Sequence, residues 1–211
     1  MLFTKTLLQA MLQAALLSVE SQQAMLNQLD TATGDGDHGT AIVAAMKAAT
    51  AGAHKEGTLK ETLETIGWDV MSYTSGSTSA LLGSFFIGMA KAVAGEELDS
   101  VQTITMFESG LDNVRPYSKA NVGDKTMMDA LIPAVESMTV LKGQTSSQPL
   151  SLADIFAAAG EAAQKGADST KDLIAKFGRA KNLGERSRGT LDAGAVSTAL
   201  IYQAYAETVK Q

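Results

Sequence analysis

Residues 3–29 read FTKTLLQAMLQAALLSVESQQAMLNQL and are the clearest sign that the chain is helical. Apolar side chains recur in this stretch at intervals of four, three and four residues, at Leu8, Leu12, Ala15 and Val19. This spacing is typical of the buried stripe of an amphipathic helix. Because Gln9 and Gln13 interrupt the apolar run, the stretch fits neither a secretion signal nor a membrane span. We therefore predict a long helix here.

The same periodicity runs through the rest of the chain, for example over residues 82–93 and 195–209. Residues 101–107 are the best strand candidate, but their apolar positions fit a helix equally well, and Asp99 or Ser100 offers an N-cap. We predict an all-α bundle of about eight antiparallel helices in a single domain over the whole chain. The expected helices are residues 3–29, 38–51, 58–73, 78–94, 100–116, 124–141, 151–176 with a break inside, and 192–210.

Composition narrows the classes of function. Of the 211 residues, 45% are apolar and 19% are charged, which indicates a globular chain, and the absence of cysteine excludes disulfides and thiolate chemistry. The net charge of −6 argues against nucleic acid as a partner, because phosphate backbones bind basic faces. No apolar run approaches the ~20 residues of a membrane span. We expect a cytoplasmic protein with neither a nucleic-acid nor a membrane partner.

Four of the connecting segments concentrate glycine, hydroxyl and charged side chains. They follow the first, third, fifth and seventh expected helices: residues 30–39, 75–79, 119–125 and 178–194. Alternate connections of an up-and-down bundle emerge at the same end. We therefore expect a polar mouth at one open end of an apolar bundle.

Asp30, Asp35 and Asp37 place three carboxylates on one glycine-rich turn. The G-x-G-x-x-G of this turn does not indicate a dinucleotide fold, because it follows a helix instead of a strand. An EF-hand is excluded too, since it would need glycine at Thr40 and glutamate at Met46. Carboxylates with few other ligands suit Mg²⁺, which completes its octahedron with waters and phosphate oxygens. The spacing leaves two interpretations open: a metal site, or a solvated turn in which Asp37 caps the next helix.

Three further features fit an anion beside such a metal. His38 directly follows the aspartates, and residues 75–79 place four hydroxyls before an apolar helix whose N-terminal N–H groups form a cradle for phosphate. Residues 176–188 hold five basic side chains and one acidic one. Alone, each feature also fits helix capping or a solvated surface. Together they describe a polyphosphate held by Mg²⁺, backbone N–H groups and arginine, an arrangement that suits phosphoryl transfer.

Four motifs in order, LDTATGDGDHG, SGSTSALLGSFF, GDKTMMDAL and GRAKNLGERSRGTLDAGA, resemble the nucleotide-binding L subunit of the dihydroxyacetone kinase family. The resemblance runs nearly end to end. It implies a barrel of eight antiparallel helices with a nucleotide, ADP or ATP, and two Mg²⁺ ions at its open end. The chain departs from the family pattern at Ala41, where asparagine is common, at Ala193, where proline is usual, and in its glycine-poor SGSTS loop.

The resemblance also implies site residues. The Mg²⁺ ligands, and with them the catalytic residues, would be Asp30, Asp35 and Asp37. The nucleotide contacts would be His38, Gly39, Thr40, Ala41, Ser77, Thr78, Ser118, Met127, Arg179, Asp192, Ala193 and Gly194. Because residues 178–194 are rich in glycine, we expect a mobile lid there, with no partner for Arg179 in the nucleotide-free protein.

The activity implied by the resemblance is phosphoryl transfer to a small ketose held on a separate K-type subunit. The phosphoryl donor would be either ATP or a phosphotransferase-system protein, the M-type subunit. The family also uses this subunit in another class of function, as a nucleotide-dependent, non-catalytic coregulator that binds a transcription factor. The sequence leaves open whether the chain forms a homodimer. The intact carboxylate triad favours catalysis.

Overall fold

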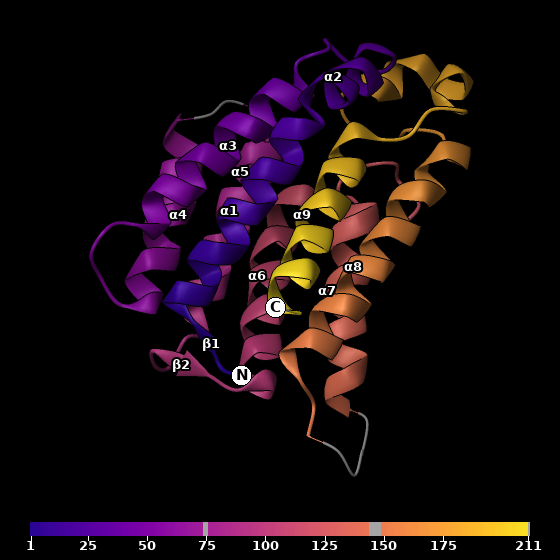
Figure 1. The fold of residues 1–211 in the computed structure, drawn as a ribbon. Helices are drawn as coiled ribbons and strands as arrows, with labels where there is room; N and C mark the ends of the chain where they lie inside the picture. Colours follow the sequence, from indigo (N-terminus) through magenta and orange to yellow (C-terminus); the bar gives the residue numbers. More distant parts are fainter. Residues whose placement is uncertain (74–75, 144–148, 211) are drawn as a thin grey trace.

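The structure is a computed structural model and describes residues 1–73, 76–143 and 149–210, most of them helical (Figure 1). The longer helices are α1 (Lys5–Ser21), α3 (His38–Ala53), α4 (Leu59–Tyr73), α5 (Ser77–Lys91), α6 (Ser100–Ser118), α7 (Met128–Gly143), α8 (Leu152–Ser169) and α9 (Ala193–Val209). The shorter elements are α2 (Gln23–Thr31), the strands β1 (Phe3–Thr4) and β2 (Glu97–Leu98), and the 3-10 helices η1 (Thr170–Asp172) and η2 (Arg179–Ser187). The predicted all-α fold class is confirmed.

Eight of the described helices form a closed ring. They pack in the order α1, α3, α4, α5, α6, α7, α8 and α9, and α9 packs back against α1. Successive helices run in opposite directions, so the connections alternate between the two ends of the ring (Figure 1). The short helix α2 packs on α3 and α9.

Side chains fix where several of these helices begin. Thr4 accepts a hydrogen bond from the backbone N–H of Leu7 at the start of α1. Asp99 and Gln102 form a reciprocal capping box at the start of α6, as the sequence predicts for Asp99. Residues 101–107 lie inside α6, so the helical interpretation of that stretch is confirmed.

The N-terminal helix differs from the prediction. The chain breaks at Gln22 into α1 and α2, so one expected helix becomes two. Phe3 also lies outside the helix, in β1, where it pairs with Leu98 of the antiparallel strand β2. Both side chains are fully buried, so the tertiary burial of Phe3 outweighs the local preference for helix.

Two later boundaries also differ. α7 begins at Met128 instead of Asp124, because the residues before it form a loop held by side-chain hydrogen bonds. α8 ends at Ser169, well before Lys176, and η1 follows it. Part of the expected loop over residues 178–194 is the 3-10 helix η2.

The interior of the ring is apolar and rich in aromatic contacts. Phe107 packs edge to face against Phe85 and Phe156, with ring centroids 5.9 and 5.4 Å apart, and such pairs contribute about 0.5–1.5 kcal/mol beyond the area they bury. Phe85, Phe107 and Tyr202 are among the residues that line a cavity of about 30 Å³. Among the described helices, none has both the length and the apolar run needed to cross a membrane.

The helices α4 and α5 touch through their backbones. A Cβ atom on Gly67 would lie 2.7 Å from the Gly83 carbonyl oxygen, and a Cβ atom on Gly83 would lie 2.6 Å from the Gly67 carbonyl oxygen. Any larger side chain at either position would push the two helices apart. Glycine at both positions therefore fixes this helix crossing.

The polar loops gather at one end of the ring, at the top of Figure 1. Lys176 donates to Asp124 Oδ1 at 2.7 Å and joins the loop before α7 to the loop before α9. Arg179 pairs with Asp35 and joins that last loop to the first one. Residues 76–79 begin α5 at the same end, whereas Ser75 lies outside the described residues. This is the predicted polar mouth.

Candidate functional site

The loop between α2 and α3 is folded around the side chain of Asp30. Its Oδ2 atom accepts hydrogen bonds from the backbone N–H groups of Gly36 at 2.9 Å and Asp37 at 3.1 Å. A Cβ atom on Gly34 would lie 2.3 Å from Oδ1 of Asp30, and Gly36 has a φ of +79°. The two glycines therefore let the backbone turn tightly around one carboxylate.

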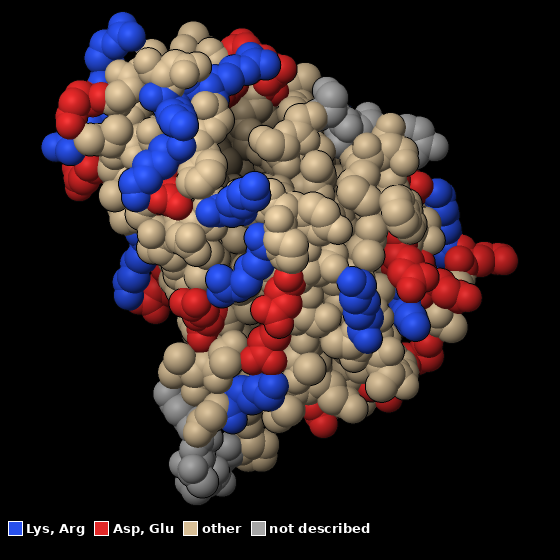
Figure 2. Space-filling model, turned by 180° about the vertical axis from the view of Figure 1, so that it is seen from behind, with Lys and Arg blue, Asp and Glu red and all other residues tan. Residues whose placement is uncertain are grey.

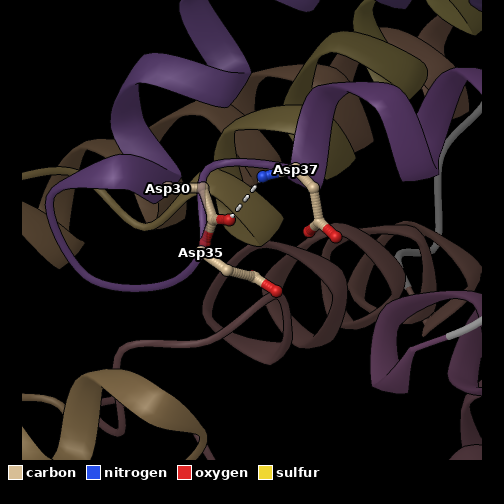
Figure 3. A group of neighbouring side chains, drawn as sticks. All are labelled: Asp30, Asp35 and Asp37. Atoms are coloured by element: carbon tan, nitrogen blue, oxygen red, sulfur yellow. Dashed lines mark hydrogen bonds between the residues drawn. The ribbon is translucent and has the colours of Figure 1, made fainter.

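The carboxylates of Asp30, Asp35 and Asp37 converge in this loop (Figure 3). One oxygen atom from each lies within 4.8 Å of the others. Opposite ligands of a Mg²⁺ ion are ~4.2 Å apart, so a small closure of the loop would bring all three to one ion. Asp37 sits at the N-cap position of α3 but makes no capping hydrogen bond with its side chain. Three hard oxygen donors in this arrangement fit a divalent cation.

Arg179, at the start of η2, forms an ion pair with Asp35. Partial desolvation raises the pKa of Asp35, but the hydrogen bond and the charge of Arg179 outweigh it, so the pKa lies below its usual value. The expectation that Arg179 has no partner in the nucleotide-free protein is therefore wrong. Three like charges that lie close together attract a cationic side chain, and here that side chain is Arg179.

His38 is the first residue of α3 and is half-buried. Its Nε2 atom lies 2.9 Å from the hydroxyl of Ser197 on α9. Burial lowers the pKa of His38, while the nearby charges of Asp30 and Asp37 oppose that shift. The start of α3 is thus held against α9 beside the aspartate cluster.

Gly39, Thr40 and Ala41 continue α3 from this point. A Cβ atom on Gly39 would lie 2.2 Å from the Gln23 carbonyl oxygen, so α3 meets α2 where only glycine fits. Thr40 Oγ1 accepts hydrogen bonds from Gln23 and Asn27 of α2. Ala41 donates its N–H to the Asp37 carbonyl oxygen as α3 begins. These contacts fix the direction in which the N-terminus of α3 points.

Ser77 and Thr78 are the first two residues of α5, with Ser77 exposed and Thr78 half-buried. Gly76 takes the N-cap position with a φ of +109°, and no side chain caps the helix. Capping therefore does not account for the hydroxyls here. Within the described residues, no hydrogen bond or ion pair joins Ser77 or Thr78 to the aspartate cluster.

The remaining sequence-derived residues lie around the start of α9. A Cβ atom on Gly194 would lie 3.3 Å from Met127 Cβ and 3.1 Å from Asp192 Oδ2, so these three residues are brought together. Ala193 is buried beside them. Ser118 ends α6, and its hydroxyl accepts a long hydrogen bond of 3.4 Å from the backbone of the next loop.

Asp192 caps α9 by accepting a hydrogen bond from the N–H of Ala195 at 2.8 Å. Desolvation, together with the charges of Asp129 and Asp30, raises the pKa of Asp192 to about 6. The start of α9 and the aspartate loop lie near each other, because α2 packs on α9 and His38, which directly follows Asp37, contacts Ser197 of α9.

The sequence analysis did not identify two buried charged residues, Lys125 and Asp129, that hold the loops near the start of α7. Lys125 is buried, and its ammonium group donates to the carbonyl oxygens of Thr170, at 2.5 Å, and Thr190. The buried Asp129 accepts from the N–H groups of Gly123 and Thr126 at the start of α7. The one available signal was the pair of charges that flank apolar residues in GDKTMMDAL.

The basic segment 176–188 surrounds the mouth. Figure 2 shows a hollow toward the upper end of the far face, with basic and acidic side chains beside it. Besides Arg179, the segment has internal and neighbouring partners: Lys176 pairs with Asp124, and Arg188 pairs with Glu185. The sequence predicts arginine on the far side of an anion from the carboxylates, whereas in the structure Arg179 pairs with the carboxylate of Asp35.

Known proteins share this arrangement of motifs and helices. The ADP-binding subunit DhaL of the PEP-dependent dihydroxyacetone kinase of Escherichia coli is 36% identical over 202 residues, which cover 92% of this chain and 91% of that protein. The L-erythrulose kinase of Pectobacterium atrosepticum is 33% identical over 185 residues, which cover 85% of this chain and 30% of that protein.

Among solved structures, the dihydroxyacetone kinase of C. freundii in complex with AMP-PNP and Mg²⁺ superposes with a TM-score of 0.71 and 25% identity. The match covers 98% of this chain and 34% of that one. A model of the DAK2 domain matches residues 32–207, from the aspartate loop to the end of α9. The resemblance found in the four motifs is thereby confirmed, and the chain belongs to the DAK2 domain family.

Proposed function

We propose that this chain is the nucleotide-binding subunit of a kinase that phosphorylates a small ketose. The observation that carries the proposal is the convergence of Asp30, Asp35 and Asp37 at the mouth of the barrel, faced by Arg179. Three carboxylates and one guanidinium suit a nucleotide bound through Mg²⁺, for which we propose two ions. The kinase relatives, one of them an ADP-binding subunit, support the same class of reaction.

The aspartates would bind the metal on one side of the phosphates. When bound, Mg²⁺ neutralises the charge of the phosphate that is transferred. The uncapped N-terminus of α5, with Ser77 and Thr78, would donate N–H and hydroxyl groups to phosphate oxygens. Residues 38–41 would do the same from α3. Phosphoryl transfer needs this positioning more than it needs a nucleophile on the protein.

The residues around α9 would hold the rest of the nucleotide. Met127 and Ser118 would border the nucleoside, and residues 192–194 would close the site from the other side. A Cβ atom on Gly194 would lie 3.3 Å from Met127 Cβ, so glycine at this position leaves space beside Met127.

The ketose itself would be held on a separate K-type subunit that docks at this mouth. The names of the relatives include dihydroxyacetone and erythrulose, so we propose a ketose of three or four carbons. For the donor we favour a phosphotransferase-system protein that recharges a bound ADP, because the Escherichia coli relative matches over most of its length and is the subunit of a PEP-dependent enzyme.

Thermal unfolding with added nucleotide tests the proposal. ADP with Mg²⁺ should raise the melting temperature strongly, since a ligand at one hundred times its Kd stabilises the native state by about 2.7 kcal/mol. ADP with EDTA should have little effect. AMP with Mg²⁺ is the matched control, because it lacks the β-phosphate that the metal would bridge. Equal stabilisation by ADP in Mg²⁺ and in EDTA would contradict the proposed metal site, and native mass spectrometry would show whether ADP copurifies.

A further inference from the structure

The only hydrogen-bond partner of the His38 ring among the described residues is on another helix, at Ser197 of α9. Ser197 is fully buried and interrupts the apolar interior of the ring of helices. We propose that Ser197 is a positioning residue of the nucleotide site: its hydroxyl donates to Nε2 of His38 and so leaves the proton of the neutral ring on Nδ1. This inference rests on the proposed function, in which the Nδ1–H group donates to a phosphate oxygen.

The direction of the hydrogen bond follows from counting protons. The Ser197 hydroxyl has one proton and two acceptors in reach, Nε2 of His38 at 2.9 Å and the Gly194 carbonyl oxygen at 3.0 Å. That carbonyl also accepts the hydroxyl of Thr198 at 2.8 Å, and it accepts the backbone N–H of Thr198 as the regular helical bond within α9. A carbonyl oxygen has two lone pairs, and both are then in use. Because the Ser197 hydroxyl would be a third donor to that carbonyl oxygen, we assign its proton to Nε2 of His38.

A neutral imidazole carries one N–H donor and one acceptor. Because Nε2 accepts from Ser197, Nδ1 is the donor. His38 stands at the first position of α3, where backbone N–H groups already favour an anion. The Nδ1–H group adds one directed donor there without adding net charge beside the three aspartates. In a free histidine side chain the Nε2–H form predominates, so the useful form has to be imposed by the protein.

The tautomer is measured directly by ¹⁵N NMR of the imidazole rings in the nucleotide-free protein at about pH 8, where the ring is neutral. The chain has two histidines, and the variant H54Q assigns the second signal. The wild type should show His38 protonated at Nδ1. The variant Ser197→Ala should move the ring toward the Nε2–H form, whereas Thr208→Ala should not, since it removes a hydroxyl of α9 that bonds to the Ala204 carbonyl oxygen. A wild-type ring protonated at Nε2, or an unchanged ring in Ser197→Ala, would overturn the inference.

A calorimetric titration with ADP and Mg²⁺ separates this inference from the proposed function. Ser197→Ala should weaken binding about fivefold, the loss expected for one hydrogen bond, and Thr208→Ala should bind as the wild type does. If the wild type binds no ADP, the proposed function fails while the NMR result still decides the hydrogen bond. If Ser197→Ala changes the tautomer but binds ADP normally, Ser197 is not a positioning residue of the site.

Discussion

Arg179 and Asp35 form an ion pair across the mouth of the barrel, so the last polar loop is held onto the first. The guanidinium of Arg179 is therefore paired with a carboxylate that we propose as a metal ligand. A divalent cation and a guanidinium compete for the same carboxylate oxygens. Binding of Mg²⁺ and nucleotide should thus release Arg179 from Asp35 and free it to contact a phosphate.

Replacing Arg179 with alanine should have opposite effects on the metal and on the nucleotide. Mg²⁺ alone should bind more tightly, because the competing cation is gone. ADP with Mg²⁺ should bind about 10- to 100-fold more weakly, the equivalent of one lost charge-assisted hydrogen bond of about 1.5–3 kcal/mol. Calorimetric titrations measure both, with Arg188→Ala as the control, since Arg188 pairs with Glu185 of the same segment. Unchanged affinities in Arg179→Ala would assign this side chain a purely surface role.

Changing Asp37 to asparagine should abolish Mg²⁺-dependent ADP binding and phosphoryl transfer while leaving the helical circular dichroism spectrum intact. The substitution removes a charge needed by the metal, and the exposed side chain makes no capping bond that the fold would lose. Asp112→Asn is the matched control, because Asp112 is an exposed carboxylate on α6. Turnover near the wild-type level in Asp37→Asn with a partner subunit would remove Asp37 from the metal site.

Lys125→Met should destabilise the protein by about 3–5 kcal/mol, the cost of removing one partner from a buried charged network. Methionine keeps the apolar stem but leaves the Thr170 and Thr190 carbonyl oxygens without their donor. It also removes a positive charge that interacts with Asp129 and Asp192. Urea unfolding measures the loss. Lys181→Met, at an exposed position of η2, should change stability by less than about 0.5 kcal/mol.

The raised pKa of Asp192 predicts a pH dependence of stability. The folded state binds this proton more tightly than the unfolded state, in which the pKa of Asp192 is near 3.8. The contribution of Asp192 to the free energy of unfolding therefore falls as pH rises from about 4 to 6. Above about pH 6 this contribution stays unfavourable to the folded state. Asp192→Asn keeps an N-cap and removes the ionisation. In EDTA, the stability of this variant relative to the wild type should rise by about 2 kcal/mol between pH 4 and pH 7.

Urea unfolding over a series of pH values checks that difference. Asp99→Asn is the control, since Asp99 is also an N-cap, at the start of α6, but it is exposed to solvent. A constant difference between Asp192→Asn and the wild type from pH 4 to pH 7 would mean that Asp192 ionises as an ordinary carboxyl.

The sequence predicts the features that repeat or cluster. Apolar stripes of several residues identify α1, α5, α6 and α9, and the three aspartates on one turn do converge in the structure. Features that depend on a single side chain meeting a distant one are not visible in this way. The partners of Ser197 and Lys125 lie far along the chain, at His38 and Thr190. The ion pair of Arg179 was missed for the same reason: spacing within a loop says nothing about which loop it faces.

The close approach of Gly67 and Gly83 determines how freely this part of the barrel can change in sequence. The main chains of α4 and α5 meet at these two glycines, with the side chains of Met71 and Ile87 packed over them, so neither position has room for a Cβ atom. Trp68, beside Gly67 in the chain, is 62% exposed and can be replaced by almost any residue without moving the start of α5. One added methyl group at Gly67 would shift that helix and, with it, the position of Ser77 and Thr78. Two adjacent positions should therefore show opposite tolerance to substitution.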